Sequence, residues 1–174
     1  MALTQPPAKG ARRITLLALL TAIALTIFMV EAQIPSLLPA IPGIKLGLAN
    51  IVTLYAVFVM GAGDALLILL ARVFLGAVLS GQMMTLLYSL GGGLLAWLVM
   101  VLLSKVLTRQ QLWLCSPVAA VFHNIGQLLV AAGVLKSWAV MAYLPYLLLS
   151  GVITGFFTGW CAQFLVQRLD NIRH

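Results

Sequence analysis

Five polar side chains that could bind a ligand lie within long apolar runs of this chain. Arg72 and Asn50 each sit in such a run, and His123, Asn124 and Gln127 cluster in a third. On a helix, positions 123 and 127 are one turn apart, and positions 124 and 127 share a face. A charge near the centre of a membrane costs about 2.5 to 3.5 kcal/mol on insertion scales, so ionisable groups in such runs are candidates for function. A guanidinium, amides and an imidazole favour a small anionic or heterocyclic ligand.

Three further polar residues flank a segment rich in proline. Glu31 and Gln33 precede this segment and Lys45 follows it, with prolines at positions 35, 39 and 42 between them. Because proline removes backbone donors, we expect a loop or a partly re-entrant cap here. Two roles are open: Glu31 and Lys45 form an ion pair that pins the loop, or together with Gln33 they line an outward-facing pocket.

The buried polar residues also leave alternatives open. Arg72 either is a structural ion-pair partner or binds an anionic group of a ligand. The cluster at 123–127 either joins helices by hydrogen bonds or binds a solute, and we favour the solute because Arg72 and Asn50 are available at similar depth. A proton relay or metal ligand at His123 is the weakest alternative, since no second His or Cys lies nearby. Asn50 is deeper than Lys45 and on a different face, unless the helix is distorted.

Several chemistries find no support in the motifs. The chain lacks a Gly-x-x-x-x-Gly-Lys-Ser/Thr loop for ATP. Its three acids are Glu31, Asp64 and Asp170, and we expect Glu31 on the opposite side of the membrane from the other two. Diphosphate chemistry with magnesium needs carboxylates gathered around the metal. We therefore predict no catalytic site, no cofactor and no metal site in this chain.

The composition identifies lipid as the solvent. Hydrophobic residues make up 63% of the 174 residues and charged residues only 7%, which is more apolar surface than one soluble core of this size could hide. The formal charge of +7 could suggest a nucleic acid as partner. Because the cations lie one or two at a time between apolar runs, we interpret them as topology signals and expect no nucleic acid.

The apolar runs predict an all-α membrane protein with about six transmembrane helices in a single domain, residues 1–174. A span needs about 20 apolar residues. The predicted helices cover residues 14–32, 45–60, 65–79, 83–103, 117–135 and 140–165. Pro117 is placed in a first turn, where proline is tolerated. Glycines at 91–93, and at 151, 155 and 159 on one face, predict close helix contacts.

The basic residues sort unequally between the two sides of this six-helix arrangement. Seven fall on one side and only Lys45 and Lys136 on the other; the seven are Lys9, Arg12, Arg13, Lys105, Arg109, Arg168 and Arg173. By the positive-inside rule the larger group is cytoplasmic. We therefore predict that both termini are cytoplasmic and that the proline-rich first loop caps the outer face.

Five segments of the chain resemble a known family. They are Glu31-Ala-Gln-Ile-Pro35, Ile44-Lys-Leu-Gly-Leu-Ala-Asn-Ile51, Arg72-Val-Phe-Leu, Val121-Phe-His-Asn-Ile-Gly-Gln127 and Tyr143-Leu-Pro145. Together they resemble the Gx transporter family, which is also labelled heptaprenyl diphosphate synthase component I. That family is similar to the substrate-binding S components of energy-coupling factor (ECF) transporters.

The resemblance implies a transport role. S components have six helices, cytoplasmic termini and a first loop over an outward-facing pocket, and they release a small solute, such as a vitamin or precursor, when partner ATPases hydrolyse ATP. Ala18 and Ala22 match the Ala-x-x-x-Ala face that packs on a coupling membrane subunit. The resemblance further implies a multi-pass protein of the bacterial cytoplasmic (inner) membrane that is not itself an enzyme. The family's other label implies an alternative, a non-catalytic membrane subunit associated with isoprenoid diphosphate or quinone synthesis.

Overall fold

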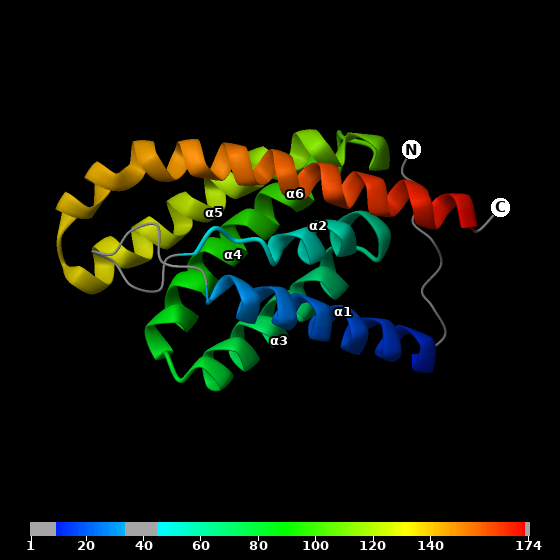
Figure 1. The fold of residues 1–174 in the computed structure, drawn as a ribbon, viewed down its shortest axis with the longest axis horizontal. Coiled ribbons are helices and arrows are strands. Elements are labelled where there is room, and N and C mark those ends of the chain that lie inside the picture. Colours follow the sequence, from blue (N-terminus) through cyan, green and yellow to red (C-terminus); the bar gives the residue numbers. More distant parts are fainter. Residues whose placement is uncertain (1–9, 34–44, 173–174) are drawn as a thin grey trace.

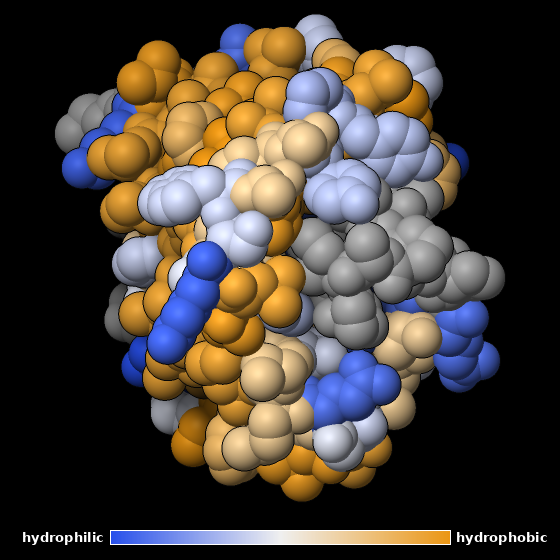
Figure 2. Space-filling model, turned by 90° about the vertical axis from the view of Figure 1, so that its left-hand side faces the viewer, coloured by the Kyte–Doolittle hydropathy of each residue, from blue (hydrophilic) through white to orange (hydrophobic). Residues whose placement is uncertain are grey.

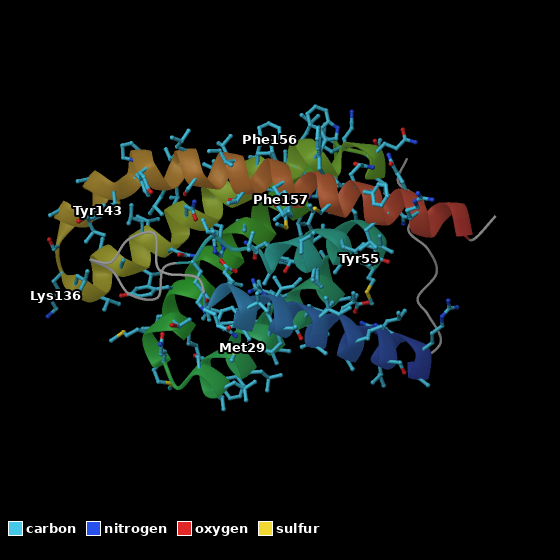
Figure 3. All side chains as sticks on the ribbon, in the orientation of Figure 1. Met29, Tyr55, Lys136, Tyr143, Phe156 and Phe157 are labelled. Carbon is cyan, nitrogen blue, oxygen red and sulfur yellow. The ribbon has the colours of Figure 1, made fainter. Side chains whose placement is uncertain are left out.

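The structure, a computed structural model, describes residues 10–33 and 45–172, and most of these residues are helical. The elements of these ranges are α1 (Gly10–Glu31), α2 (Asn50–Val59), α3 (Ala62–Ser80), α4 (Met83–Leu103), η1 (Arg109–Gln111), α5 (Leu112–Leu135), η2 (Trp138–Tyr143) and α6 (Leu144–Ile172), where η marks a 3₁₀ helix. Successive α-helices alternate in direction, so α1 begins and α6 ends at the same end of the bundle (Figure 1). We call this the terminal end. The opposite end, at Lys136, is the far end (Figure 3). The predicted all-α bundle is confirmed.

Five described segments are long and apolar enough to cross a membrane. They are Gly10–Glu31, Ala62–Ser80, Met83–Leu103, Arg109–Leu135 and Trp138–Arg168. Large apolar side chains are exposed along them, for example Phe74 on α3 and Phe157 on α6. Even at the far end, apolar residues cover most of the view and hydrophilic ones are scattered (Figure 2). The chain is therefore a multi-pass membrane protein.

The second predicted helix is shorter than expected. It was placed at 45–60, but α2 begins at Asn50 and has ten residues, about 15 Å of helix and half of a membrane core. The cause is local: Gly47 has φ +80°, a left-handed conformation that no helix accommodates. At the other end Gly61, with φ +111°, separates α2 from α3. Figure 1 shows α2 beginning midway along the bundle and running toward the terminal end.

Three other predicted boundaries are also corrected. Pro117 is not in the first turn of α5, because that helix already begins at Leu112, whose N–H donates to Gln163 Oε1 at 2.9 Å. Helix α6 begins at Leu144 rather than at 140, since residues 138–143 form the 3₁₀ helix η2. Pro145 lies in the first turn of α6, where proline is tolerated. Helix α6 also continues to Ile172, past the predicted end at 165.

Glycines bring α4, α5 and α6 into close contact, as predicted. A Cβ atom built on Gly126 of α5 would lie 2.6 Å from the backbone oxygen of Gly91 on α4. A Cβ built on Gly155 of α6 would lie 2.5 Å from the Cα of Pro117 on α5. These distances are too short for any side chain, so the helix backbones themselves touch. The three helices form a closely packed scaffold.

Helix α1 is much less enclosed than the scaffold. Only Ala24, Phe28 and Glu31 of its 22 residues are buried. Near the terminal end, Arg13 makes an exposed ion pair with Asp64 of α3. Towards the middle of the bundle, the chain that follows α1 is joined to α5 by hydrogen bonds, which form the candidate site. The side of the membrane that each end of the bundle faces stays a prediction.

Candidate functional site

The segment Lys45–Ala49 runs into the bundle without helical structure, and Gln127 of α5 binds its backbone. Gln127 Oε1 accepts the Lys45 N–H at 3.1 Å, and Gln127 Nε2 donates to the Lys45 carbonyl at 3.1 Å. Both oxygen and nitrogen of one amide are thus used, which fixes the orientation of the side chain. In effect, a side chain in the middle of α5 replaces the backbone partners that a helix would have supplied to Lys45.

Gly47 lies where this segment meets α5. A Cβ built on it would be 2.8 Å from His123 Cδ2 and 2.9 Å from Asn50 Nδ2. Together with its positive φ, this crowding admits only glycine at position 47. The close approach brings the backbone of the segment against the imidazole of α5 and the amide of α2.

Glu31, the last residue of α1, caps the start of α2 from a distance. Its Oε1 accepts the Gly47 N–H at 2.6 Å and its Oε2 accepts the Leu48 N–H at 3.1 Å. The first bond of the helical turn runs from Asn50 N to Gly47 O, so these two N–H groups have no partner inside α2. A carboxylate at the positive end of a helix is electrostatically favoured. Glu31 is 5% exposed, which makes this a buried charge.

The Glu31–Lys45 ion pair, one of the two expected alternatives, does not form. Over residues 10–33 and 45–172 the ion pair within 4.0 Å is Arg13–Asp64. The Lys45 ammonium instead lies 3.4 Å from the centre of the Phe28 ring, a cation–π contact. Glu31 still feels attraction from Lys45 and Arg72 at longer range. The segment Lys45–Ala49 is therefore attached by hydrogen bonds to its backbone rather than by paired charges.

Arg72 and Asn50 meet across α3 and α2. Arg72 Nη2 donates to Asn50 Oδ1 at 2.8 Å, which is the partner that the amide of Asn50 required. Arg72 is 2% exposed, and its Nε has no hydrogen-bond partner among the described residues. No carboxylate of the described chain pairs with it within 4.0 Å. The structural ion pair considered for Arg72 is thus absent there, and a buried cation is left without a counter-charge in contact, which is costly.

His123 joins the same cluster through Gln127. The two side chains are hydrogen-bonded through Nε2 of each. Because the Gln127 amide nitrogen only donates, the His123 Nε2 accepts, and the imidazole carries its proton on Nδ1. Gly92 of α4 makes this arrangement fit, since a Cβ there would be 2.7 Å from Gln127 Cγ. The glycines of α4 thus leave space for the polar residues of α5.

The sequence-predicted residues therefore converge in large part. The structure brings six of the eight into one cluster, in which Lys45 is half-buried and the other five are buried, and we call it the polar cluster: Glu31, Lys45, Asn50, Arg72, His123 and Gln127. Its charged members are two cations and one carboxylate. Because α2 begins midway along the bundle, the cluster lies about midway between the terminal end and the far end (Figure 1). A buried site with surplus positive charge is suited to an anion.

Asn124 and Gln33 do not join the polar cluster. Asn124 Nδ2 donates to the Leu147 carbonyl of α6 at 2.6 Å, so its side chain faces α6 and joins two helices. This is the interhelical role that was the alternative for the 123–127 group. Gln33 lies in the turn after α1 with its side chain exposed. A role of either residue in solute binding stays a prediction.

The proposed partner surface on α1 lies on the outside of the bundle. Ala18 and Ala22 are both exposed, one helical turn apart. Small exposed side chains allow another helix, or lipid, to approach α1 closely. The packing on a coupling subunit remains a prediction.

Sequence reasoning missed the backbone donors of the site. The N–H groups of Gly47 and Leu48 hold Glu31, yet only side chains were considered as binding groups. The glycine between two leucines, just after the proline-rich segment, was the available signal. Phe28 under Lys45 and Thr53, whose buried hydroxyl has no partner in the described part of the chain, were also missed.

Comparison with known families gave one finding. The family model described as heptaprenyl diphosphate synthase component I matches residues 20–165. These residues include every member of the polar cluster. Comparisons with curated proteins and with solved structures found no match.

Proposed function

Because the chain belongs to the heptaprenyl diphosphate synthase component I family, the family that its sequence resembles, we propose that it is the solute-binding membrane subunit of a transporter. In this role it resembles the S components of ECF transporters, takes up a small anionic or heterocyclic solute such as a vitamin or precursor, and is energised by partner ATPases through a coupling membrane subunit. The expected location is the bacterial inner membrane.

One observation carries this proposal: polar groups from four separate parts of the chain converge about midway along the helix bundle of a membrane protein. Arg72 of α3, Asn50 of α2, His123 and Gln127 of α5 and Glu31 of α1 are far apart in sequence and buried together. Placing these groups in hydrocarbon is costly, and a solute that uses them explains their presence. The surplus cation supports an anionic solute.

The test is to purify the protein from its native membrane and identify retained small molecules by mass spectrometry. Binding of the identified solute is then compared in wild type, Arg72→Ala and Arg13→Ala. Removing a buried, charged hydrogen-bond donor from a bound anion is expected to weaken binding by about 2 kcal/mol, roughly thirtyfold. Arg13 is a matched arginine outside the cluster and its variant should bind normally. Unchanged binding in Arg72→Ala would refute the site.

The family description favours a second candidate, a non-catalytic subunit for isoprenoid diphosphate synthesis. In this role Lys45 and Arg72 hold a diphosphate while a separate enzyme performs the reaction. Co-purification distinguishes the candidates: ATPases and a coupling subunit support transport, and a prenyltransferase supports the alternative.

A further inference from the structure

The Glu31 carboxylate accepts hydrogen bonds from two consecutive backbone N–H groups. Each of its two oxygens accepts one N–H, from Gly47 at 2.6 Å and from Leu48 at 3.1 Å. Two consecutive N–H groups beside a residue with positive φ form a concave anion-binding arrangement. The positive end of the ten-residue helix α2 adds to the attraction. The spacing of these donors therefore matches the two oxygens of one carboxylate.

Arg72 provides an independent sign of a ligand at the same place. Its guanidinium is directed at the first turn of α2, where it donates to Asn50 at 2.8 Å. The side chain is 98% buried, and Nε has no hydrogen-bond partner among the described residues. The Glu31 carboxylate attracts the Arg72 guanidinium electrostatically, but the two groups are not within 4.0 Å of each other. Asn50 connects the two groups, because its Oδ1 accepts from Arg72 and its Nδ2 would lie 2.9 Å from a Cβ built on Gly47. The buried guanidinium, whose Nε is unused, can therefore take a second carboxylate oxygen.

We propose that the Gly47 and Leu48 N–H groups and Arg72 form a carboxylate site, which Glu31 fills and from which a carboxylate of the solute displaces it. This inference rests on the proposed function and names the chemical class of its solute. The two carboxylates compete, because each backbone N–H donates one strong hydrogen bond. Glu31 thus competes with the solute carboxylate, and it leaves the Gly47 and Leu48 N–H groups when the solute binds.

The test uses formate, the smallest carboxylate, so the solute need not be known. The Tm of the purified wild-type protein and of the Glu31→Ala variant is measured by tryptophan fluorescence at increasing formate concentrations. Formate binds the folded protein and raises Tm. If Glu31 occupies the Gly47 and Leu48 N–H groups in at least nine-tenths of the molecules, at most one-tenth are free to bind formate. Removing the Glu31 carboxylate then lowers the half-saturating formate concentration by about tenfold or more. Formamide, which is similar in shape but uncharged, should leave Tm unchanged.

Three further variants complete the design. Arg72→Gln in the Glu31→Ala background should abolish the response to formate. Asp64→Asn removes a carboxylate outside the cluster and should behave as wild type. Glu31→Gln, which keeps one oxygen acceptor for the segment, replaces Glu31→Ala if the latter does not fold, and it should also bind formate more tightly than wild type.

The inference is overturned if formate half-saturates wild type and the Glu31 variants equally, if formamide acts like formate, or if no variant responds. Its failure is separable from that of the transport role. If the protein retains and takes up a solute that lacks a carboxylate, the carboxylate site is refuted and the transport role still stands. Formate binding that depends on Glu31 and Arg72, in a protein that retains and transports no solute, would support the carboxylate site and remove the transport role.

Discussion

The α5–α6 pair is held together by close backbone packing in addition to hydrogen bonds, whereas the α1–α2 region is joined mainly by hydrogen bonds. Between α5 and α6, glycines at 151, 155 and 159 bring the helices so close that an added Cβ would lie 2.5 to 2.8 Å from the nearest atom of the neighbouring helix. Between α1 and α2, a carboxylate binds the backbone of a non-helical segment. Close apolar contacts cannot change without repacking, whereas hydrogen bonds to free backbone groups can be exchanged for those of a ligand. We therefore interpret the first region as a scaffold and the second as the candidate site.

The largest expected effect comes from disturbing the scaffold. Gly126→Ala places a methyl group 2.6 Å from a backbone oxygen of Gly91, and neither backbone can yield easily. We expect a loss of about 3 kcal/mol in the free energy of unfolding, at the upper end for overpacking. Reversible unfolding in mixed detergent micelles measures it.

Gly133 on the same helix provides the matched control for this prediction. A Cβ built there meets nothing within 4 Å, so Gly133→Ala should leave stability unchanged or raise it slightly through helix propensity. Equal destabilisation by the two alanines would show that α4 and α5 do not pack as described, and the contrast between scaffold and site would lose its basis.

A smaller effect separates the two regions directly, because each has a glutamine that binds distant backbone. Gln127 holds the N–H and carbonyl of Lys45, and Gln163 holds the Leu112 N–H and the Arg109 carbonyl at 2.9 Å each. Changing either to leucine should cost about 2 kcal/mol of stability, because buried backbone groups lose their partners. Only Gln127→Leu should also speed amide hydrogen exchange at Lys45 and weaken solute binding. If Gln127→Leu and Gln163→Leu weakened solute binding equally, the distinction between the scaffold and the candidate site would be refuted.

The smallest effect is expected at the exposed ion pair near the terminal end. Arg13 and Asp64 are in contact, but the Arg13 side chain is 45% exposed, so water and salt screen the pair. Asp64→Asn should change Tm little at low salt and not at all at high salt, and solute binding should stay as in wild type. A large loss of binding would show that the attachment of α1 to α3 belongs to the site.

The sequence predicted the helices well where their apolar pattern is long. The order, the type and most boundaries of α1, α3 and α4 agree with the structure. The convergence of Arg72 and Asn50 with the cluster on α5 followed from the scarcity of polar residues in apolar runs. Composition fixes these features because lipid leaves few alternatives for a polar side chain.

Other features depend on contacts that no local pattern reveals. The positive φ of Gly47 ends the helix locally, but the non-helical segment before α2 is also held by Glu31 and Gln127, which are 16 and 82 residues away from the backbone groups they bind. Asn124 and Gln127 are three residues apart, yet the first faces α6 and the second faces Lys45, because the helix is enclosed on both sides. Spacing gives the angle between two side chains but does not say which neighbour each one meets.

The half-length of α2 has an electrical consequence. Its first turn lies about midway along the bundle (Figure 1), so in a membrane centred on the bundle an anion that reaches Asn50 from either face would have crossed about half of the membrane potential. Moving one elementary charge through half of that field is worth about 1 kcal/mol per 100 mV. In a cell with a negative interior, this work opposes an anion that arrives from outside. The positive charge gathered around the start of α2 would offset this work, and we expect occupancy of the candidate site to depend on membrane voltage.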